Sequence, residues 1–254
     1  MNSTPVIVVK DLKKSYEKFE AVKGVSFDVF EKEIFGLLGP NGAGKTTTLE
    51  IIETLREKTS GEVTVAGFSI DQHPNEIKKI IGVQLQAAGY YPSLTLTELI
   101  ELFAGLYNAE VDPMEMLKQV GLEDKYKAKF KELSGGQKQR FSIATTLINQ
   151  PKIVFLDEPT TGLDPQARRN LWDLIRKIRD NGTTVVITTH YMDEAEQLCD
   201  RVAVMEAGKI IALDAPDALI DQLVATGFER KKEVKKANLE DVFIHLTGHE
   251  WREG

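Results

Sequence analysis

Short apolar runs alternate along the chain with segments in which apolar residues recur every three or four positions. Runs of four to six apolar residues bounded by turn-forming residues are typical of β-strands. The predicted strands are residues 6–9, 25–29, 34–38, 62–65, 68–70, 81–85, 153–156, 184–188 and 201–206. Turns at 31–33 and 66–67 predict hairpins that join the second strand to the third and the fourth strand to the fifth.

Helical periodicity marks the segments between several of these strands. The predicted helices are residues 46–55, 98–106 with Thr97 as N-cap, one that begins at Pro113, one preceded by Ser134, 166–179 and 192–198. In 166–179 the apolar residues recur at the helical period: Leu171, Leu174, Ile175 and Ile178. This helix is therefore expected to pack one face on a sheet.

The alternation of short apolar strands with helices predicts an α/β fold with a mainly parallel sheet covered on both sides. The hairpins near the N-terminus predict an antiparallel β subdomain. Residues of about 87–150 are mostly helical and interrupt the alternation, which indicates an inserted helical subdomain. We expect one main domain over residues 1–226 and a C-terminal extension, with a basic connector and a short helix, over 227–254.

The most specific motif is a glycine-rich segment between the strand 34–38 and the helix 46–55. It reads Gly39-Pro40-Asn41-Gly42-Ala43-Gly44-Lys45-Thr46 and fits G-x-x-x-x-G-K-[ST]. Glycines let successive backbone N–H groups turn inward as an anion nest, and the helix adds its positive N-terminal end. Lys45 would reach the β- and γ-phosphates, and Thr46 would offer a hydroxyl to Mg²⁺. A glycine turn that precedes a lysine by chance is the alternative, and the strand–loop–helix context favours phosphate binding.

Two carboxylates follow the apolar strand 153–156. Asp157 is placed to hold Mg²⁺, and Glu158 can polarise an attacking water. Acidic pairs after strands are also common in surface loops. Beside a phosphate loop, metal binding is the better interpretation.

Two further segments carry candidate phosphate contacts. Ser134-Gly135-Gly136-Gln137 follows Leu133 and heads a helix, which gives a second set of N–H groups that could bind an anion. A chain with one nucleotide loop would need a second anion-binding helix end only if that end binds a nucleotide held by another subunit. The alternative is that Ser134 is an ordinary helix N-cap. His190 follows the strand 184–188, where a ligand crevice is expected, and we interpret it as a γ-phosphate contact rather than a structural histidine.

In this order, these segments resemble the ATP-binding subunit of an ABC transporter, a P-loop NTPase with a RecA-like core. The resemblance covers about residues 6–214, and its motifs are 39–47, 133–137, 156–159, 162–164 and His190. It implies ATP and Mg²⁺ as cofactors, with Thr47 part of the nucleotide loop. It also implies a head-to-tail dimer in which each ATP lies between one subunit's phosphate loop and the signature segment 133–137 of the other.

Three more roles follow from the resemblance by position. Tyr16 matches the aromatic residue that stacks on adenine, although a tyrosine at a hairpin end can also be a packing residue. Gln86 matches the glutamine that links Mg²⁺ and water to the membrane partner, and Gln84 is the neighbouring alternative. Asp164 matches the aspartate that couples the two sites. Thr161 stands where many members of the family have serine.

Composition narrows the choice of function. The 254 residues are 42% apolar and 28% charged, with a net charge of −7 and a pI near 5.3. Such a chain is globular, and its acidity argues against a nucleic-acid partner. Cys199 is the single cysteine, so we expect no internal disulfide and a reducing compartment. No apolar run reaches the length of about 18 residues that a membrane helix needs.

The function we expect is ATP hydrolysis that energises a separate transmembrane permease, in a homodimer or a dimer with a related ATPase. Its location would be cytoplasmic, on the inner face of the membrane. Residues 238–248 resemble the tail of subunits that serve ABC-2 type exporters, although they could be only a terminal amphipathic helix. The basic residues in 228–236 could touch anionic lipid but fit a solvated connector better. The alternatives are a soluble ABC-type ATPase that acts on nucleic acid or ribosomes, and a nucleotide sensor without turnover.

Overall fold

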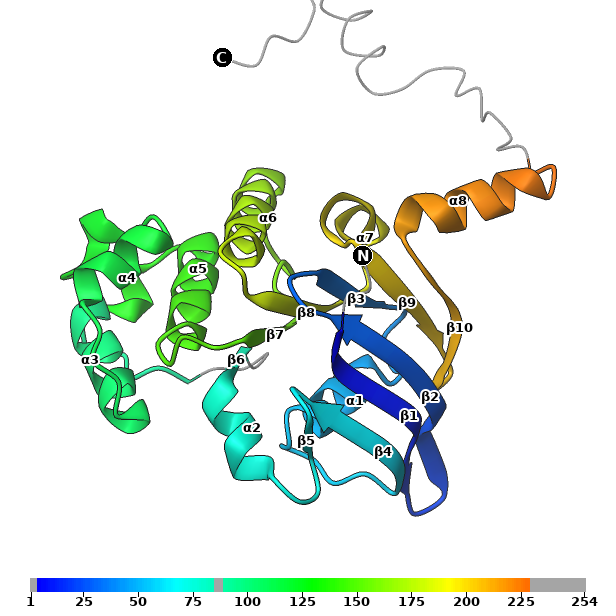
Figure 1. Ribbon diagram of the computed structural model, residues 1–254. Coiled ribbons are helices and arrows are strands. Elements are labelled where there is room, and N and C mark those ends of the chain that lie inside the picture. The colour runs from blue at the N-terminus through cyan, green and yellow to red at the C-terminus, as the bar shows by residue number, and fades with distance from the viewer. Residues whose placement is uncertain (1–3, 85–88, 229–254) are drawn as a thin grey trace, which may run out of the picture. The chain divides into compact units, whose positions relative to one another are not determined.

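Two β-sheets form the framework of the computed structural model, which describes residues 4–84 and 89–228 (Figure 1). One is antiparallel, in the order β2 (Phe19–Phe30), β1 (Pro5–Tyr16), β4 (Ser60–Val65) and β5 (Phe68–Ser69). The other has the order β10 (Lys209–Asp214), β9 (Arg201–Glu206), β3 (Ile34–Leu38), β8 (Thr184–Thr189), β7 (Ile153–Asp157) and β6 (Ile81–Gln84). In the second sheet only β10 runs antiparallel to its neighbour.

The three central strands β3, β8 and β7 are buried along their whole length. Parallel sheets carry helices on both faces, so their central strands are apolar at successive positions and do not alternate. Because these strands are parallel, their C-terminal ends meet at one edge of the sheet, where loops 39–44, 158–164 and 190–191 begin. The predicted α/β class is confirmed.

The described part of the chain contains eight α-helices. They are α1 (Lys45–Ile52), α2 (Pro74–Ile80), α3 (Leu96–Tyr107), α4 (Pro113–Gln119), α5 (Gly135–Thr146), α6 (Pro165–Asp180), α7 (Met192–Leu198) and α8 (Pro216–Ala225), with short 3₁₀ turns at Glu123–Lys125 and Phe130–Glu132. Helices α3, α4 and α5 lie between β6 and β7 in sequence and pack on one another (Figure 1). They form the predicted helical insertion.

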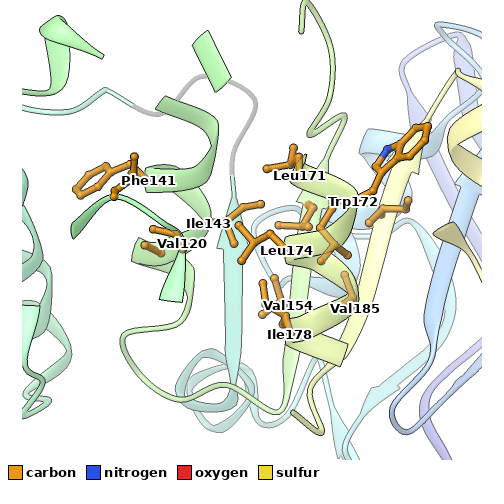
Figure 2. Close-up of a cluster of buried hydrophobic side chains, with 14 of the residues drawn as sticks. Val120, Phe141, Ile143, Val154, Leu171, Trp172, Leu174, Ile178 and Val185 are labelled. Atoms are coloured by element: carbon orange, nitrogen blue, oxygen red, sulfur yellow. The ribbon is translucent and has the colours of Figure 1, made fainter. Parts of the chain in front are cut away.

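Helix α6 packs one face on the parallel sheet, as its periodicity predicts. Leu171, Leu174 and Ile178 belong to the same buried cluster as Val154 of β7 and Val185 of β8 (Figure 2). Full burial of each aliphatic side chain stabilises the fold by about 1.5–3 kcal/mol. This packing fixes the start of α6 relative to the sheet edge at which the candidate site lies.

Two local predictions are wrong. The turn at 31–33 does not close a hairpin, because β2 pairs with β1 whereas β3 pairs with β8 and β9 in the other sheet. Thr97 does not cap the helix of 98–106. The N-cap of α3 is Thr95, which forms a capping box with Glu98, and the Thr97 hydroxyl donates to the carbonyl of Tyr126.

The chain divides into two compact units, residues 1–219 and 220–254, and the second is described only as far as residue 228. Three predictions therefore lie outside the described residues: Gln86, the basic segment beyond Phe228, and the tail 238–248. Within residues 4–84 and 89–228, no helix is long and apolar enough to cross a bilayer.

Candidate nucleotide site

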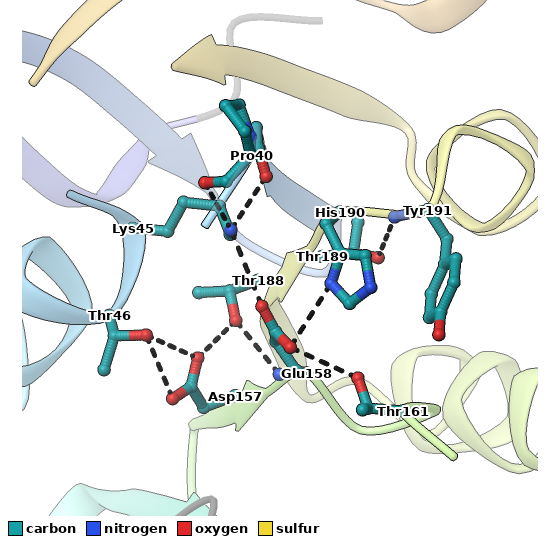
Figure 3. Close-up of polar contacts among 11 residues, drawn as sticks. Pro40, Lys45, Thr46, Asp157, Glu158, Thr161, Thr188, Thr189, His190 and Tyr191 are labelled. Carbon is teal, nitrogen blue, oxygen red and sulfur yellow. Dashed lines mark hydrogen bonds and ion pairs between the residues drawn. The ribbon is translucent and has the colours of Figure 1, made fainter. Parts of the chain in front are cut away.

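The glycine-rich loop joins β3 to α1 and encloses the side chain of Lys45. Gly44 has a φ of 99°, and a side chain there would also meet the carbonyl of Ala21 at 2.6 Å, so glycine is required. Lys45 is buried, and its ammonium donates to the carbonyls of Gly39 at 2.8 Å and Pro40 at 3.2 Å (Figure 3). The loop therefore holds one cation at the N-terminus of α1, where the helix also favours an anion.

Asp157 ends β7 beside the start of α1. The Thr46 hydroxyl lies 3.2 Å from both oxygens of the Asp157 carboxylate. The hydroxyl of Thr188, on the neighbouring strand β8, donates to the same carboxylate (Figure 3). A carboxylate and a hydroxyl are the hard oxygen ligands that Mg²⁺ takes together with phosphate oxygens. The residues present at this place therefore fit a magnesium ion.

Glu158 lies between Lys45 and His190. Its Oε1 is 3.6 Å from Lys45 Nζ, its Oε2 is 3.3 Å from His190 Nδ1, and the Thr161 hydroxyl donates to Oε2 at 3.2 Å (Figure 3). Its backbone has a φ of 47°, which is costly for a non-glycine residue. The backbone N–H of Glu158 donates to the carbonyl and hydroxyl of Thr188, which holds this conformation.

A cavity of about 360 Å³ opens over the loop. Its lining residues are Tyr16, Phe19, Ala21, Asn41, Gly42, Gly44, Lys45, Thr46, Thr47 and Glu158. Tyr16 ends β1 and Phe19 begins β2, and the two are partners in the hairpin. Lys14 Nζ and Arg56 Cζ lie 5.0 and 5.5 Å from the centre of the Tyr16 ring. The structure thus brings Tyr16 to the same cavity as the phosphate loop.

The signature segment forms the N-terminus of α5. Ser134 Oγ accepts from the N–H of Gln137 at 3.3 Å, and Gln137 Oε1 accepts from the N–H of Ser134 at 2.9 Å. Ser134 therefore acts as the helix N-cap, which is the alternative interpretation of this segment. The first N–H groups of α5 still have no partners inside the helix. No hydrogen bond or ion pair among residues 4–84 and 89–228 joins 134–137 to the loop 39–47.

Asp164 caps α6 in its own chain, since its Oδ1 accepts from the N–H of Ala167 at 2.8 Å. Gln84, the alternative to Gln86, is buried at the end of β6, and its Oε1 has no hydrogen-bond partner among the described residues. Neither residue lines the cavity over the loop.

Three residues contact the site without a predicted role there, although Thr161 stands out in the sequence as a position where many members of the family have serine. Phe19 lines the cavity, Thr188 bridges Asp157 and the backbone of Glu158, and Thr161 holds the Glu158 carboxylate. Thr188 could have been found, because a polar residue that ends an apolar strand lies at the edge where ligands bind.

A buried carboxyl group, Glu53, lies at the C-cap of α1. Burial, together with the charges of Asp157 and Glu50, raises the pKa of Glu53 from its ordinary 4.5 to about 8. The folded protein therefore keeps a proton on Glu53 at pH values at which the unfolded chain has lost it. Under this linkage the free energy of unfolding falls as pH rises from about 4.5 towards 8.

We expect the variant Glu53→Gln, which is neutral at every pH, to remove this dependence. Between pH 5 and pH 8, the free energy of unfolding of the wild type should fall by about 3 kcal/mol relative to that of Glu53→Gln, since one pKa unit corresponds to about 1.4 kcal/mol. Urea unfolding at the two pH values measures the difference. Glu57→Gln, at an exposed position, is the control, and its free energy of unfolding should change with pH as that of the wild type does. If the free energy of Glu53→Gln changed with pH in the same way as that of the wild type, the expectation would be contradicted.

A glycine-rich loop of the form G-x-x-x-x-G-K-[ST] after β3, a histidine after β8 and two carboxylates at the end of β7 form the arrangement that is typical of a P-loop nucleoside triphosphatase. The sequence profile of the ABC transporter family matches residues 22–161. The chain belongs to this family, and it is an ATP-binding, ATP-hydrolysing subunit.

Relatives and solved structures agree with this assignment. The linearmycin resistance ATP-binding protein LnrL of Bacillus subtilis (strain 168) is 38% identical, over 86% of this chain and 72% of that protein. A Nod factor export ATP-binding protein I of Burkholderia orbicola is 34% identical, over 99% of this chain and all of that protein. A dimeric ATP-binding cassette in a post-hydrolysis state bound to ADP and Pi has a TM-score of 0.74 at 30% identity, over 83% of this chain and 98% of that one.

Proposed function

We propose that this chain is the ATPase subunit of an ABC-2 type exporter, working as a head-to-tail dimer on a separate transmembrane permease. The observation that supports the dimer is that the chain holds two segments that suit phosphate, and that the residues lining the cavity over loop 39–47 include none of 134–137. Loop 39–47 and the capped end of α5 at Ser134 both suit phosphate, and no hydrogen bond or ion pair in the described ranges joins them. Two copies face to face would complete two sites.

In this proposal Lys45 and the loop amides hold the β- and γ-phosphates, and Thr46 and Asp157 hold Mg²⁺. The metal ion would neutralise charge on the phosphate oxygens. Glu158 would orient the attacking water and accept its proton, and its contact with Lys45 supports a position beside the γ-phosphate. His190 would contact the γ-phosphate from β8. Phosphoryl transfer needs positioning and charge stabilisation more than covalent chemistry, and this set of residues supplies both.

The signature end of the other subunit would close the far side of the γ-phosphate. Its donors are Ser134 and the N–H groups of Gly135 and Gly136, with Gln137 completing the cap. Asp164 at the start of α6 would face the other site. Tyr16, with Phe19 beside it in the cavity, would stack on adenine.

The exporter class is supported by the relatives and by the tail 238–248, which lies outside the described residues. The relatives are named for Nod factor export and linearmycin resistance. We infer that this chain binds a permease through the segment at Gln86, and that this contact places it on the cytoplasmic face of the membrane.

The concentration dependence of ATP hydrolysis tests the dimer. If two subunits form each site, the specific rate of phosphate release by the isolated chain should rise with its concentration and level off when dimers predominate. A full specific rate at concentrations where the chain is monomeric by sedimentation would contradict the dimer.

Co-purification tests the membrane role against the alternative of a soluble ATPase that acts on nucleic acid or ribosomes. The tagged chain should come from detergent-solubilised membranes with a polytopic protein. Recovery with ribosomes or nucleic acid and no such protein would favour the alternative.

A further inference from the structure

Four side chains that follow one another along α6 contact α7 or residue Asp200, which lies two residues after the end of α7. The contacts are Arg168 Nη1 to Asp193 Oδ2 at 3.0 Å, Trp172 Nε1 to Glu194 Oε1 at 3.0 Å, Arg176 Nη2 to the carbonyl of Gln197 at 2.6 Å, and Arg179 Nη1 to Asp200 Oδ2 at 3.1 Å. Their spacing of three or four residues puts them on one face of α6. Only the first contact lies next to the site, because α7 begins two residues after His190.

Arg168 reaches His190 through one intermediate ring. Its Cζ lies 4.6 Å from the centre of the Tyr191 ring, and that ring lies 4.1 Å from the His190 ring. Asp193 forms an ion pair with the same guanidinium. Arg168 Nε is buried without a hydrogen-bond partner among the described residues, so the ion pair and the ring contact hold the guanidinium at this place. The contacts form an unbroken series from α6 to the imidazole beside Glu158.

The same turn of α6 also touches the signature segment of its own chain. A Cβ atom at Gly136 would lie 3.0 Å from the Cβ of Ala167, and one at Gly135 would lie 3.8 Å from Leu163. The first turn of α6 therefore lies between the start of α5 and the ring that abuts His190.

We propose that Arg168 is a positioning residue for ATP hydrolysis, which holds the Tyr191 ring against His190 and so fixes the imidazole beside Glu158. The inference rests on the proposed function, from which it takes the role of His190. A planar guanidinium can stack on a ring while it pairs with a carboxylate, whereas an ammonium cannot match this geometry. A misplacement of about 1 Å in a catalytic group can cost about 10²-fold in rate.

Steady-state kinetics with a matched control give the first test. Arg168→Met should lower kcat by between about 10-fold and 100-fold, with the KM for ATP within about 2-fold of wild type. Arg176→Met removes the equivalent contact two turns further along α6 and should leave both constants within about 2-fold. Arg168→Lys should not restore kcat. Equal losses in the variants of Arg168 and Arg176, or full rescue by Lys, would overturn the proposal.

Asp193→Asn serves where Arg168→Met folds poorly, because it keeps the arginine and removes only the carboxylate at an exposed position. Its kcat should fall in the same direction by about 3-fold or more, since the guanidinium would lose its charged partner. A wild-type kcat in Asp193→Asn would contradict the claim that Asp193 holds the Arg168 guanidinium in place.

A double variant separates positioning from a general structural role. If Arg168 acts through His190, Arg168→Met should change the residual kcat of His190→Gln by less than about 2-fold. A further loss equal to that seen in the wild type would overturn the proposal. No change in kcat from His190→Gln alone would instead overturn the role of His190 in the proposed function.

Spectroscopy reads the contact without hydrolysis. The chain has four histidines, and the ring signals of His190 in labelled protein can be assigned by their loss in His190→Gln. Arg168→Met should shift them and Arg176→Met should not, because the Tyr191 ring would move only in the first. Unchanged His190 signals in Arg168→Met would overturn the positioning contact, whatever the kinetics.

Discussion

Replacing Glu158 by Gln is expected to lower the rate of ATP hydrolysis by about 10²–10⁴-fold, the usual contribution of a general base. Gln has the same shape and its amide oxygen can still accept from the Thr161 hydroxyl, so the local fold should survive. What is lost is the charge that faces Lys45 and His190 and the ability to take a proton from water.

ATP binding should persist or tighten in Glu158→Gln. The carboxylate lies 3.6 Å from Lys45 Nζ, and a neutral amide there would leave the whole charge of Lys45 to the phosphates. In the proposed dimer the nucleotide would be held and not cleaved. We therefore expect a dimer that accumulates with ATP and disperses when ATP is removed.

Phosphate release and size-exclusion chromatography with ATP measure the two effects. Glu206→Gln is the matched control, since Glu206 is an exposed acid at the end of β9 and should keep the wild-type rate. Turnover at the wild-type rate in Glu158→Gln would remove Glu158 from the role of base. Loss of ATP binding together with turnover would point to misfolding of the loop instead.

The fold was predictable where a strand is a short apolar run inside the parallel sheet. β3, β7 and β8 are such runs, because both of their faces are covered. β10 and α8 were missed, since β10 alternates only weakly between intermediate and exposed positions and α8 has no buried residue. The false hairpin at 31–33 shows the limit of local signals, because a turn does not reveal that the chain changes sheets.

The candidate site divides in the same way. Lys45 could be found because it completes the glycine-rich motif. Asp157 and His190 could be found because each comes at the end of a recognisable strand, and strand ends of a parallel sheet share one edge. Thr161 and Arg168 could not, because their contacts depend on how loop 158–164 folds back and on how α6 meets α7. Neither sequence spacing nor residue type encodes those distances.

The second large effect is expected at the exposed start of α5. A negative charge there should stabilise the folded subunit slightly but strongly lower its rate of ATP hydrolysis. Gly135 is the first residue of α5, and the Cβ atom of a substituent would meet only Leu163, at an ordinary 3.8 Å. An acid in the first turn of a helix is favourable by about 0.3–1 kcal/mol. Gly135→Asp should therefore unfold at the wild-type temperature or slightly above it.

In the proposed dimer the same carboxylate would face the γ-phosphate held by the other subunit. The carboxylate would repel the like-charged phosphate and push it away from the donors at the start of α5. Loss of one such donor contact costs about 2.7–4 kcal/mol, so hydrolysis should fall by about 10²-fold or more. Binding of a fluorescent ATP analogue to the monomer should be unchanged, because loop 39–47 belongs to the other half-site. Gly135→Asn, without the charge, should lose far less activity. If Gly135→Asp hydrolysed ATP at the wild-type rate, the end of α5 could not lie against phosphate, and the helix would be capped for stability alone.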